Sequence, residues 1–167
     1  VNFLKSQDAA MELVNQIQGQ GGQAIAVRAD VSERDDVQAM IEVVGEHFGR
    51  LDIVVSNAAA GGFRPLTEVT PAGFDSILRM NAAPLLWLTQ AALPLFKASP
   101  DISRVIAISS HGSIRGIANY GLVGTSKAAL ESLVRHLAFE LGPSGVNFNA
   151  VMPGIVETAA IKTLPGS

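Results

Sequence analysis

The sequence predicts an α/β fold, a doubly wound parallel sheet covered by helices, and three observations carry this prediction. Short apolar segments alternate along the chain with longer segments of helical periodicity. The apolar segments are uniformly hydrophobic, as is typical of parallel strands buried on both faces. Hydrophobic residues make up 48% of the 167 residues and charged residues only 16%, which fits a large core. Without repeats or a low-complexity linker, residues 1–167 are predicted to form a single domain.

The predicted elements follow one another in order along the chain. Helices are expected at 6–20, from about 33 to 48, from 71, at 81–97 and at 119–141, and strands at 1–3, 23–29, 51–56, 104–109 and 146–151. Two glycines at 21 and 22 end the first helix, and Ser32 opens a pattern that resembles a capping box for the second. Thr70 is a predicted cap because proline follows it at the first helical position. The helix at 81–97 is expected despite its prolines at 84 and 94.

The composition excludes several classes of function. The net charge of −3 leaves no basic surface for nucleic acid. There is no cysteine, so neither a disulfide nor a thiolate metal site is expected, and the scattered histidines His47, His111 and His136 show no metal-ligand spacing. No apolar run is long enough for a membrane span, and no signal-peptide pattern opens the chain, so a cytoplasmic location is predicted.

Tyr120, the only tyrosine, stands seven residues before Lys127. On a helix of about 100° per residue, seven steps come within about 20° of whole turns, so both side chains share one face about 10 Å apart. A phenol near a fixed cation is a better proton donor. The pair is a candidate acid–base site, and the alternative is a partly buried tyrosine with an unrelated surface lysine.

Polar and glycine-rich residues follow the predicted strands, where open α/β sheets bind their ligands. These residues are Asp30, Asn57-Ala58-Ala59 with Gly61-Gly62, Ser109-Ser110 and Pro153-Gly154. With the tyrosine–lysine helix, they resemble the short-chain dehydrogenase/reductase family over essentially the whole chain. The matching pieces are Asp30-Val31, Asn57-Ala58-Ala59, Met80-Asn81-Ala82, Ile108-Ser109-Ser110, Ser126-Lys127-Ala128-Ala129-Leu130 and Asn149-Ala150-Val151 with Pro153-Gly154.

The resemblance implies a Rossmann-like fold, a nicotinamide cofactor and a role for each matching residue. Cofactor contacts are expected from Asp30 and Val31 at the adenine, from Asn57, Ala58, Ala59, Pro153 and Gly154 along the cofactor, from Lys127 at the nicotinamide ribose and from Thr158 at the carboxamide or diphosphate. Asn81 would hold a water of a proton relay, and Ser110 would hydrogen-bond the substrate or Tyr120. Lys5 with Ser6 follows the strand at which the adenosine ribose is read, so a 2′-phosphate is favoured and NADP is expected over NAD.

The spacing of the pair departs from the usual pattern of the family, which places tyrosine four residues before lysine, at Val123 in this chain. Seven-residue spacing resembles bacterial enoyl-acyl-carrier-protein reductases, and the segment from Ser110 to Glu131 looks most like their third type. An enoyl thioester accepts hydride at C3 and develops charge on an oxygen two carbons away, so its acid must stand about one helical turn, 5.4 Å, farther from the nicotinamide. The resemblance implies NADPH-dependent reduction of trans-2-enoyl thioesters in fatty acid elongation, with Tyr120, Lys127, Ser110 and Asn81 as catalytic residues.

A second departure is the missing glycine-rich phosphate loop of the family. It would precede Val1 with a first strand, which belongs between the strands ending at Phe3 and starting at Leu51, and a last strand would follow Ser167. We therefore expect a longer natural chain and poor cofactor binding by residues 1–167 alone.

Two alternatives remain open: a carbonyl or 3-oxoacyl reductase of the same family, and a truncated, non-catalytic scaffold. The expected partners are an enoyl-thioester substrate, carried by acyl carrier protein or coenzyme A, and a second copy of the chain. Arg64 and Arg115 would contact the acidic carrier or the phosphopantetheine, and the alternative is that they are solvated surface residues. The resemblance implies a homodimer or homotetramer that pairs the helices containing residues 85–95 and 130–141.

Overall fold

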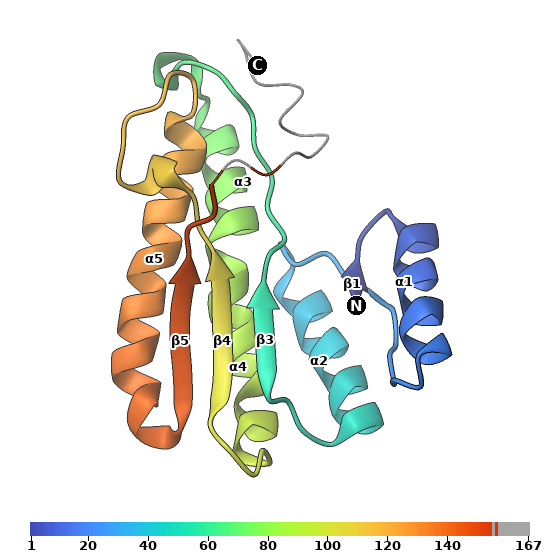
Figure 1. The fold of residues 1–167 in the computed structure, drawn as a ribbon. Coiled ribbons are helices and arrows are strands. Elements are labelled where there is room, and N and C mark those ends of the chain that lie inside the picture. The colour runs from blue at the N-terminus through green and yellow to red at the C-terminus, as the bar shows by residue number, and fades with distance from the viewer. Residues whose placement is uncertain (155, 157–167) are drawn as a thin grey trace.

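The structure, a computed structural model, describes residues 1–154 and residue 156, and it confirms the predicted α/β class (Figure 1). Its strands are β1 (Asn2–Phe3), β2 (Val27–Arg28), β3 (Ile53–Ser56), β4 (Ser103–Ile108) and β5 (Val146–Val151). The helices are α1 (Gln7–Gly19), α2 (Arg34–Phe48), α3 (Pro71–Asn81), α4 (Ala83–Lys97) and α5 (Gly121–Leu141), with 3₁₀ turns η1 (Leu66–Glu68), η2 (His111–Ser113) and η3 (Gly142–Ser144). No helix in these described residues is long and apolar enough to cross a membrane.

The described strands form two parallel sheets. β1 pairs with β2 through Asn2 opposite Val27 and Phe3 opposite Arg28. β3, β4 and β5 form the larger sheet in that order, with Val105 of β4 opposite both Val54 and Phe148. Because all strands within a sheet are parallel, their carboxyl ends lie at one edge, which is the upper edge of the larger sheet in Figure 1.

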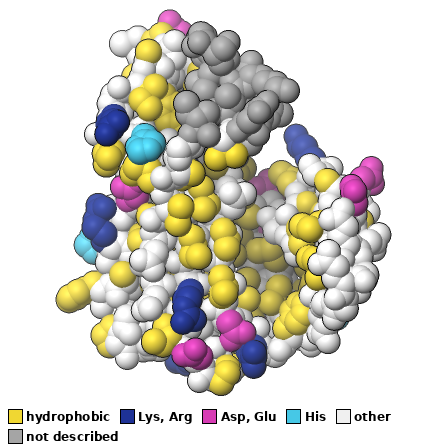
Figure 2. Space-filling model, in the orientation of Figure 1, with side chains coloured by type: hydrophobic (Ala, Val, Ile, Leu, Met, Phe, Trp, Pro, Cys, Tyr) yellow, Lys and Arg dark blue, Asp and Glu magenta, His cyan; other side chains and the backbone are white. Residues whose placement is uncertain are grey.

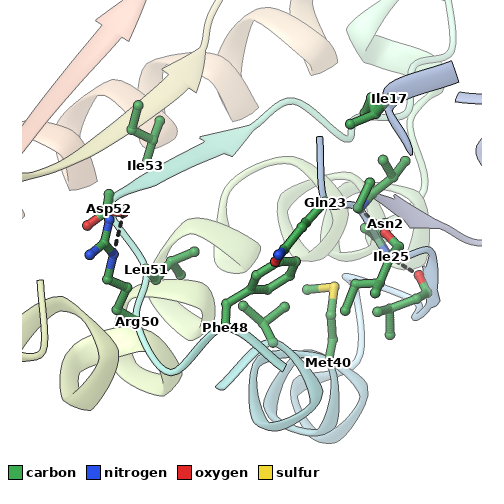
Figure 3. Close-up of a pocket in the computed structure, with 14 residues that line it drawn as sticks. Asn2, Ile17, Gln23, Ile25, Met40, Phe48, Arg50, Leu51, Asp52 and Ile53 are labelled. Carbon is green, nitrogen blue, oxygen red and sulfur yellow. Dashed lines mark hydrogen bonds and ion pairs between the residues drawn. The ribbon is translucent and has the colours of Figure 1, made fainter. Parts of the chain in front are cut away.

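An apolar cavity of about 740 Å³ separates the two sheets. Figure 2 shows it as a hollow lined by hydrophobic side chains, and Figure 3 shows Met40, Phe48 and Ile53 around it. A second cavity of about 320 Å³ runs along β3 as far as Asn57 and Ala58. These cavities lie where the expected strand order places a further central strand, and that placement stays a prediction.

Helices α4 and α5 cover one face of the larger sheet, where Leu85, Val105 and Leu130 are almost completely buried (Figure 1). The opposite face differs from the prediction that strands are buried on both sides. Successive side chains of a strand point to opposite faces, so Ile53 and Val55 lie on the other side from the buried Val54. They are 56% and 54% exposed among the residues that the structure describes.

The strand predicted at residues 23–29 is shorter than expected. It pairs only at Val27 and Arg28, because β1 offers only Asn2 and Phe3 as register partners. The strand predicted at 146–151 has the expected bounds, and the Thr70 cap is confirmed by a bond of 3.1 Å from the Gly73 N–H to its hydroxyl.

The helix predicted at about 81–97 is confirmed as α4, which begins at Ala83 and ends at Lys97. Its start is separated from α3 at Ala82, because Pro84 has no N–H with which to continue the α-helical ladder of α3. The capping box at Ser32 does not form: its hydroxyl donates to Asp30 Oδ1 at 2.6 Å instead, and Glu33 is the N-cap of α2 without a side-chain bond. The Asp30–Ser32 turn competes locally with the helix cap.

The helix that carries Lys127 begins two residues later than predicted. Asn119 has φ +59°, in the left-handed region that asparagine tolerates better than most residues, and this turn keeps it out of the helix. Tyr120 is therefore the N-cap of α5, and its carbonyl accepts the first helical bond from Gly124 N at 2.8 Å. The phenol projects from the start of the helix, over the loop that follows β4.

Candidate active site

The predicted site residues gather at the carboxyl ends of the strands, as the sequence indicates. Those of the larger sheet are Asn57, Ala58 and Ala59 after β3, Ser109 and Ser110 after β4, and Pro153 and Gly154 after β5. Lys5, Ser6, Asp30 and Val31 follow β1 and β2 and so belong to the smaller sheet. Thr158 lies outside the described residues.

Tyr120 and Ser110 are brought into direct contact. The phenol hydroxyl donates to Ser110 Oγ at 3.0 Å, one of the two partners predicted for this serine. The ring of Tyr120 stacks on Phe63, with centroids 5.8 Å apart and planes inclined by 25°. A methyl group on Gly112 would overlap the Tyr120 ring, so only glycine allows this approach. Phe63 and Gly112 thus both lie against the ring, and its hydroxyl bonds Ser110.

Lys127 is buried, with 6% of its surface exposed, so the alternative of a surface lysine is wrong. Its ammonium donates to the carbonyl oxygen of Ile108 at 2.7 Å, at the end of β4. Burial lowers the pKa of Lys127 below its usual 10.5, because desolvation disfavours the charged form. An ammonium has three N–H donors, and one is used by Ile108. Within residues 1–154 and 156 the other two have no partner, which suits the hydroxyls of a bound ribose.

The buried lysine predicts a pH dependence of stability. Between its lowered folded pKa and 10.5 the unfolded chain binds more protons, so the free energy of unfolding should rise with pH in this window. We expect Lys127→Met to lack that rise in urea denaturation between pH 7 and 10, while the exposed control Lys97→Met retains it. Identical pH dependence in the two variants would contradict the direction of the shift.

The buried side chain of Asn81 joins the loop after β3 to helix α5. Its Oδ1 accepts from the Ala60 N–H at 2.8 Å, and its Nδ2 donates to the Ala60 carbonyl and to Ser126 Oγ, each at 2.9 Å. Ser126 in turn donates to the Val123 carbonyl at 2.7 Å. Both N–H groups of Asn81 are used, so a relay water would have to donate to the remaining lone pair of Oδ1. The relay role stays a prediction, whereas these bonds fix the loop after β3 against α5.

Val123 fills the position at which the family usually carries tyrosine. It is 5% exposed, and its Cγ2 lies 3.3 Å from the point at which Gly61 would carry a Cβ. The same loop is joined to the start of α5 by the Arg64 N–H, which donates to the Asn119 carbonyl at 2.9 Å. Val123 is therefore a packing residue, and Tyr120, the only tyrosine of the chain, is the phenol available next to the lysine.

The end of the smaller sheet holds the residues predicted to read adenosine. Asp30 Oδ1 accepts from the hydroxyl and the N–H of Ser32, at 2.6 and 2.9 Å, and the hydroxyl bond is the main cause that lowers the pKa of Asp30. Val31 packs into the core, so its backbone rather than its side chain is left for a ligand. Lys5 and Ser6 are exposed.

Sequence reasoning missed Arg28 as a second cation at this position. Its Nε donates at 3.3 Å to the carbonyl of Leu4, the residue before Lys5. The register of β1 and β2 places Arg28 next to the segment that carries Lys5, and only a strand-pairing prediction could have indicated it.

Glu131 was missed as well. Its Oε1 accepts hydrogen bonds from the hydroxyls of Ser109 and Ser113, the latter at 2.6 Å. The only available signal was its position one helical turn after Lys127, on the face of α5 that meets β4.

The described residues fit a nicotinamide nucleotide. Asn57, Ala58 and Ala59 are exposed after β3, and the Lys127 ammonium bonds Ile108 at the end of the neighbouring strand β4. No group of three or more histidine or acidic side chains in the described part of the chain is arranged for a metal ion.

The chain belongs to the short-chain dehydrogenase/reductase family. Residues 1–167 match the family described as Enoyl-(Acyl carrier protein) reductase. Over 162 residues, 97% of this chain, it is 38% identical to 1-cyclohexenylcarbonyl-CoA reductase of Streptomyces collinus. It is also 35% identical, over 95% of its length, to versicolorin reductase stcU of Emericella nidulans. The chain spans 57% and 59% of these two relatives, respectively.

Solved structures of the family superimpose closely on this fold. A short-chain dehydrogenase of Burkholderia cenocepacia in complex with NADP gives a TM-score of 0.88 at 32% identity, covering 95% of this chain and 64% of that one. A dehydrogenase/reductase of Sinorhizobium meliloti also gives 0.88, at 31% identity, over 95% of this chain and 62% of the other. The family resemblance and the Rossmann-like fold predicted from the sequence are confirmed.

Proposed function

We propose that the protein is an NADPH-dependent reductase of the 2,3 double bond of trans-2-enoyl thioesters, as in fatty acid elongation. The observation that carries this proposal is the position of the proton donor. The phenol of Tyr120 stands at the N-cap of α5 and contacts Ser110, while the apolar Val123 occupies the position nearer to Lys127. This displacement suits a substrate whose charge develops away from the carbon that receives hydride.

The residues have distinct tasks in the proposed reaction. When bound, the reduced nicotinamide cofactor supplies a hydride to C3 of the substrate. The C2–C3 double bond becomes single as negative charge develops on the thioester oxygen, which Tyr120 stabilises by donating its hydroxyl proton in a hydrogen bond. For this step the phenol proton turns from Ser110 Oγ, which accepts it in the structure, to the thioester oxygen, and Ser110 then holds the phenol by donating its own hydroxyl proton to the phenol oxygen. Lys127 holds the ribose, and C2 finally receives a proton from solvent or from the phenol, which solvent then reprotonates.

Two findings support the substrate class and the cofactor. The Streptomyces collinus relative is named for a cyclohexenylcarbonyl-CoA, a thioester with a ring double bond. Lys5 and Arg28 place two cations at the end of the smaller sheet, which favours the 2′-phosphate of NADP over the free hydroxyl of NAD.

A carbonyl reductase is the second candidate function. Relatives named versicolorin reductase and hydroxynaphthalene reductase favour it, because those substrates are a different class from enoyl thioesters. The Tyr120–Ser110 pair would serve that reaction as well, with the phenol donating to the carbonyl oxygen.

A substrate panel on the intact protein separates the candidates. NADPH oxidation is followed with crotonyl-CoA and with acetoacetyl-CoA, and each reaction is repeated with NADH. We expect crotonyl-CoA to be reduced with a kcat/KM at least about tenfold higher than acetoacetyl-CoA, and NADPH to be preferred. The reverse substrate preference would favour the carbonyl reductase, and no oxidation of NADPH with either would favour a non-catalytic scaffold.

We also propose that the acyl group is carried by acyl carrier protein or coenzyme A, and that the protein is a homodimer or homotetramer. Arg64 and Arg115 are exposed near the site, in loops before η1 and after η2, where they suit an acidic carrier. Phe139, on α5, is 85% exposed and supports self-association through this helix.

A further inference from the structure

We propose that Glu131 is a positioning residue that sets the direction of the Tyr120 hydroxyl by anchoring the loop that carries Ser110. This inference rests on the proposed catalytic role of Tyr120, and it assigns a task to a carboxylate outside the tyrosine–lysine pair. Glu131 is half-buried on α5, and one oxygen, Oε1, accepts hydrogen bonds from two serine hydroxyls.

The two serines stand on either side of Ser110. Ser109 directly follows β4 and is 4% exposed, and Ser113 is the last residue of the 3₁₀ turn η2. Both hydroxyls point to the same carboxylate oxygen, so the segment 109–113 is held to α5 at both of its ends. Ser110, between them, accepts the hydroxyl of Tyr120 at 3.0 Å.

Glu131 is one of three residues of α5, spaced about one helical turn apart, that contact the segment after β4. Gly124 touches the backbone of Gly112, Lys127 donates to Ile108 one turn later, and Glu131 follows after another turn. The first two residues restrain the backbone. Glu131 alone among them binds side-chain hydroxyls, and it fixes the rotation of the loop about the end of β4.

A carboxylate in this position has no ion-pair partner among the described residues, whose salt bridges are Arg50–Asp52 and Arg79–Glu33. Burying part of a carboxylate costs free energy that neutral hydroxyls offset only partly. If residue 131 only had to fill space, a neutral serine or threonine would cost less free energy to bury than a carboxylate. The geometry indicates that the role of Glu131 is to accept the two hydrogen bonds from Ser109 and Ser113.

The test is a double-mutant cycle in the intact protein, assayed with NADPH and crotonyl-CoA. We expect Glu131→Ala to lower kcat about tenfold while the KM values change less than about twofold, because a small displacement of a catalytic group slows the reaction without weakening binding. Glu131→Gln should restore kcat to within about threefold of wild type, since its amide oxygen accepts the same two hydroxyls. Glu140→Ala, on the exposed side of the same helix, is the matched control and should leave both constants unchanged.

The cycle with Tyr120→Phe decides whether Glu131 acts through the phenol. In the Tyr120→Phe background, Glu131→Ala should cause no further fall in kcat. A full, additive tenfold fall there, or an unchanged kcat in the single variant, would overturn the proposal. If Glu131→Ala does not fold, Ser113→Ala removes one of the two hydroxyl donors and should lower kcat about threefold, again only when Tyr120 is present. An unchanged turnover of Tyr120→Phe itself would instead refute the proposed function.

Discussion

Replacing Tyr120 with phenylalanine is expected to lower kcat for crotonyl-CoA reduction about 100-fold or more. The variant removes one oxygen atom and keeps the ring that stacks on Phe63 and covers Gly112, so the fold around it should be intact. What is lost is the donor to the thioester oxygen and the bond to Ser110. Steady-state kinetics with saturating NADPH measures the effect, and far-UV circular dichroism checks the fold.

The control for this experiment is Val123→Ala. If Tyr120 is the proton donor, a smaller side chain at 123 should leave the chemical step within about threefold of wild type. Enlarging Val123 to phenylalanine is less suitable, because Gly61 lies against it and the core tolerates added volume poorly. A wild-type kcat in Tyr120→Phe, or a 100-fold loss in Val123→Ala, would contradict the assignment.

Gly124→Ala is expected to have the second large effect. A methyl group at this position would overlap the carbonyl oxygen of Gly112 and lie 3.1 Å from its carbonyl carbon. Both are backbone atoms, so the contact is relieved only by moving η2 away from α5. We expect a loss of about 1–3 kcal/mol in the free energy of unfolding, as for overpacked cores, and a fall in kcat of about 100-fold as Ser110 leaves Tyr120.

Gly142→Ala is the matched control for Gly124→Ala. Gly142 also has helical backbone angles, at the end of α5, and a methyl group there has nothing within 4 Å. Its substitution should be neutral or slightly stabilising, because alanine has less freedom than glycine in the unfolded chain. Urea denaturation and turnover are compared for the two variants. Equal stability and equal turnover in both would show that η2 does not need its close contact with α5.

The elements that could be predicted from the sequence are those set by local signals. Thr70 before proline predicted the start of α3, and the segment at 146–151 was predicted as a strand with the bounds observed for β5. Where two local signals compete, the prediction was wrong. Ser32 was expected to cap α2, yet the neighbouring Asp30 takes its hydroxyl, and the sequence pattern alone does not rank these two bonds.

The candidate site divides in the same way. Tyr120, Lys127 and the strand-end residues were identified because residue type and spacing carry their chemistry. The contacts of Asn81 and Glu131 were not foreseen, because each joins residues separated by 18 or more positions in the chain. Such bonds depend on how α3, α5 and the loops after β3 and β4 pack together.

The sequence by itself determined the family, the alternation of strands and helices, and the displacement of the tyrosine to seven residues before Lys127. All three are properties of residue order, which spacing and resemblance can show. Only the tertiary structure decided that Lys127 is buried and that Tyr120 is the N-cap of α5 in contact with Ser110. It also decided that Glu131 accepts hydrogen bonds from the loop after β4 that carries Ser110. These features require the left-handed turn at Asn119 and the close approach of Gly112 to α5, which arise from packing between distant segments.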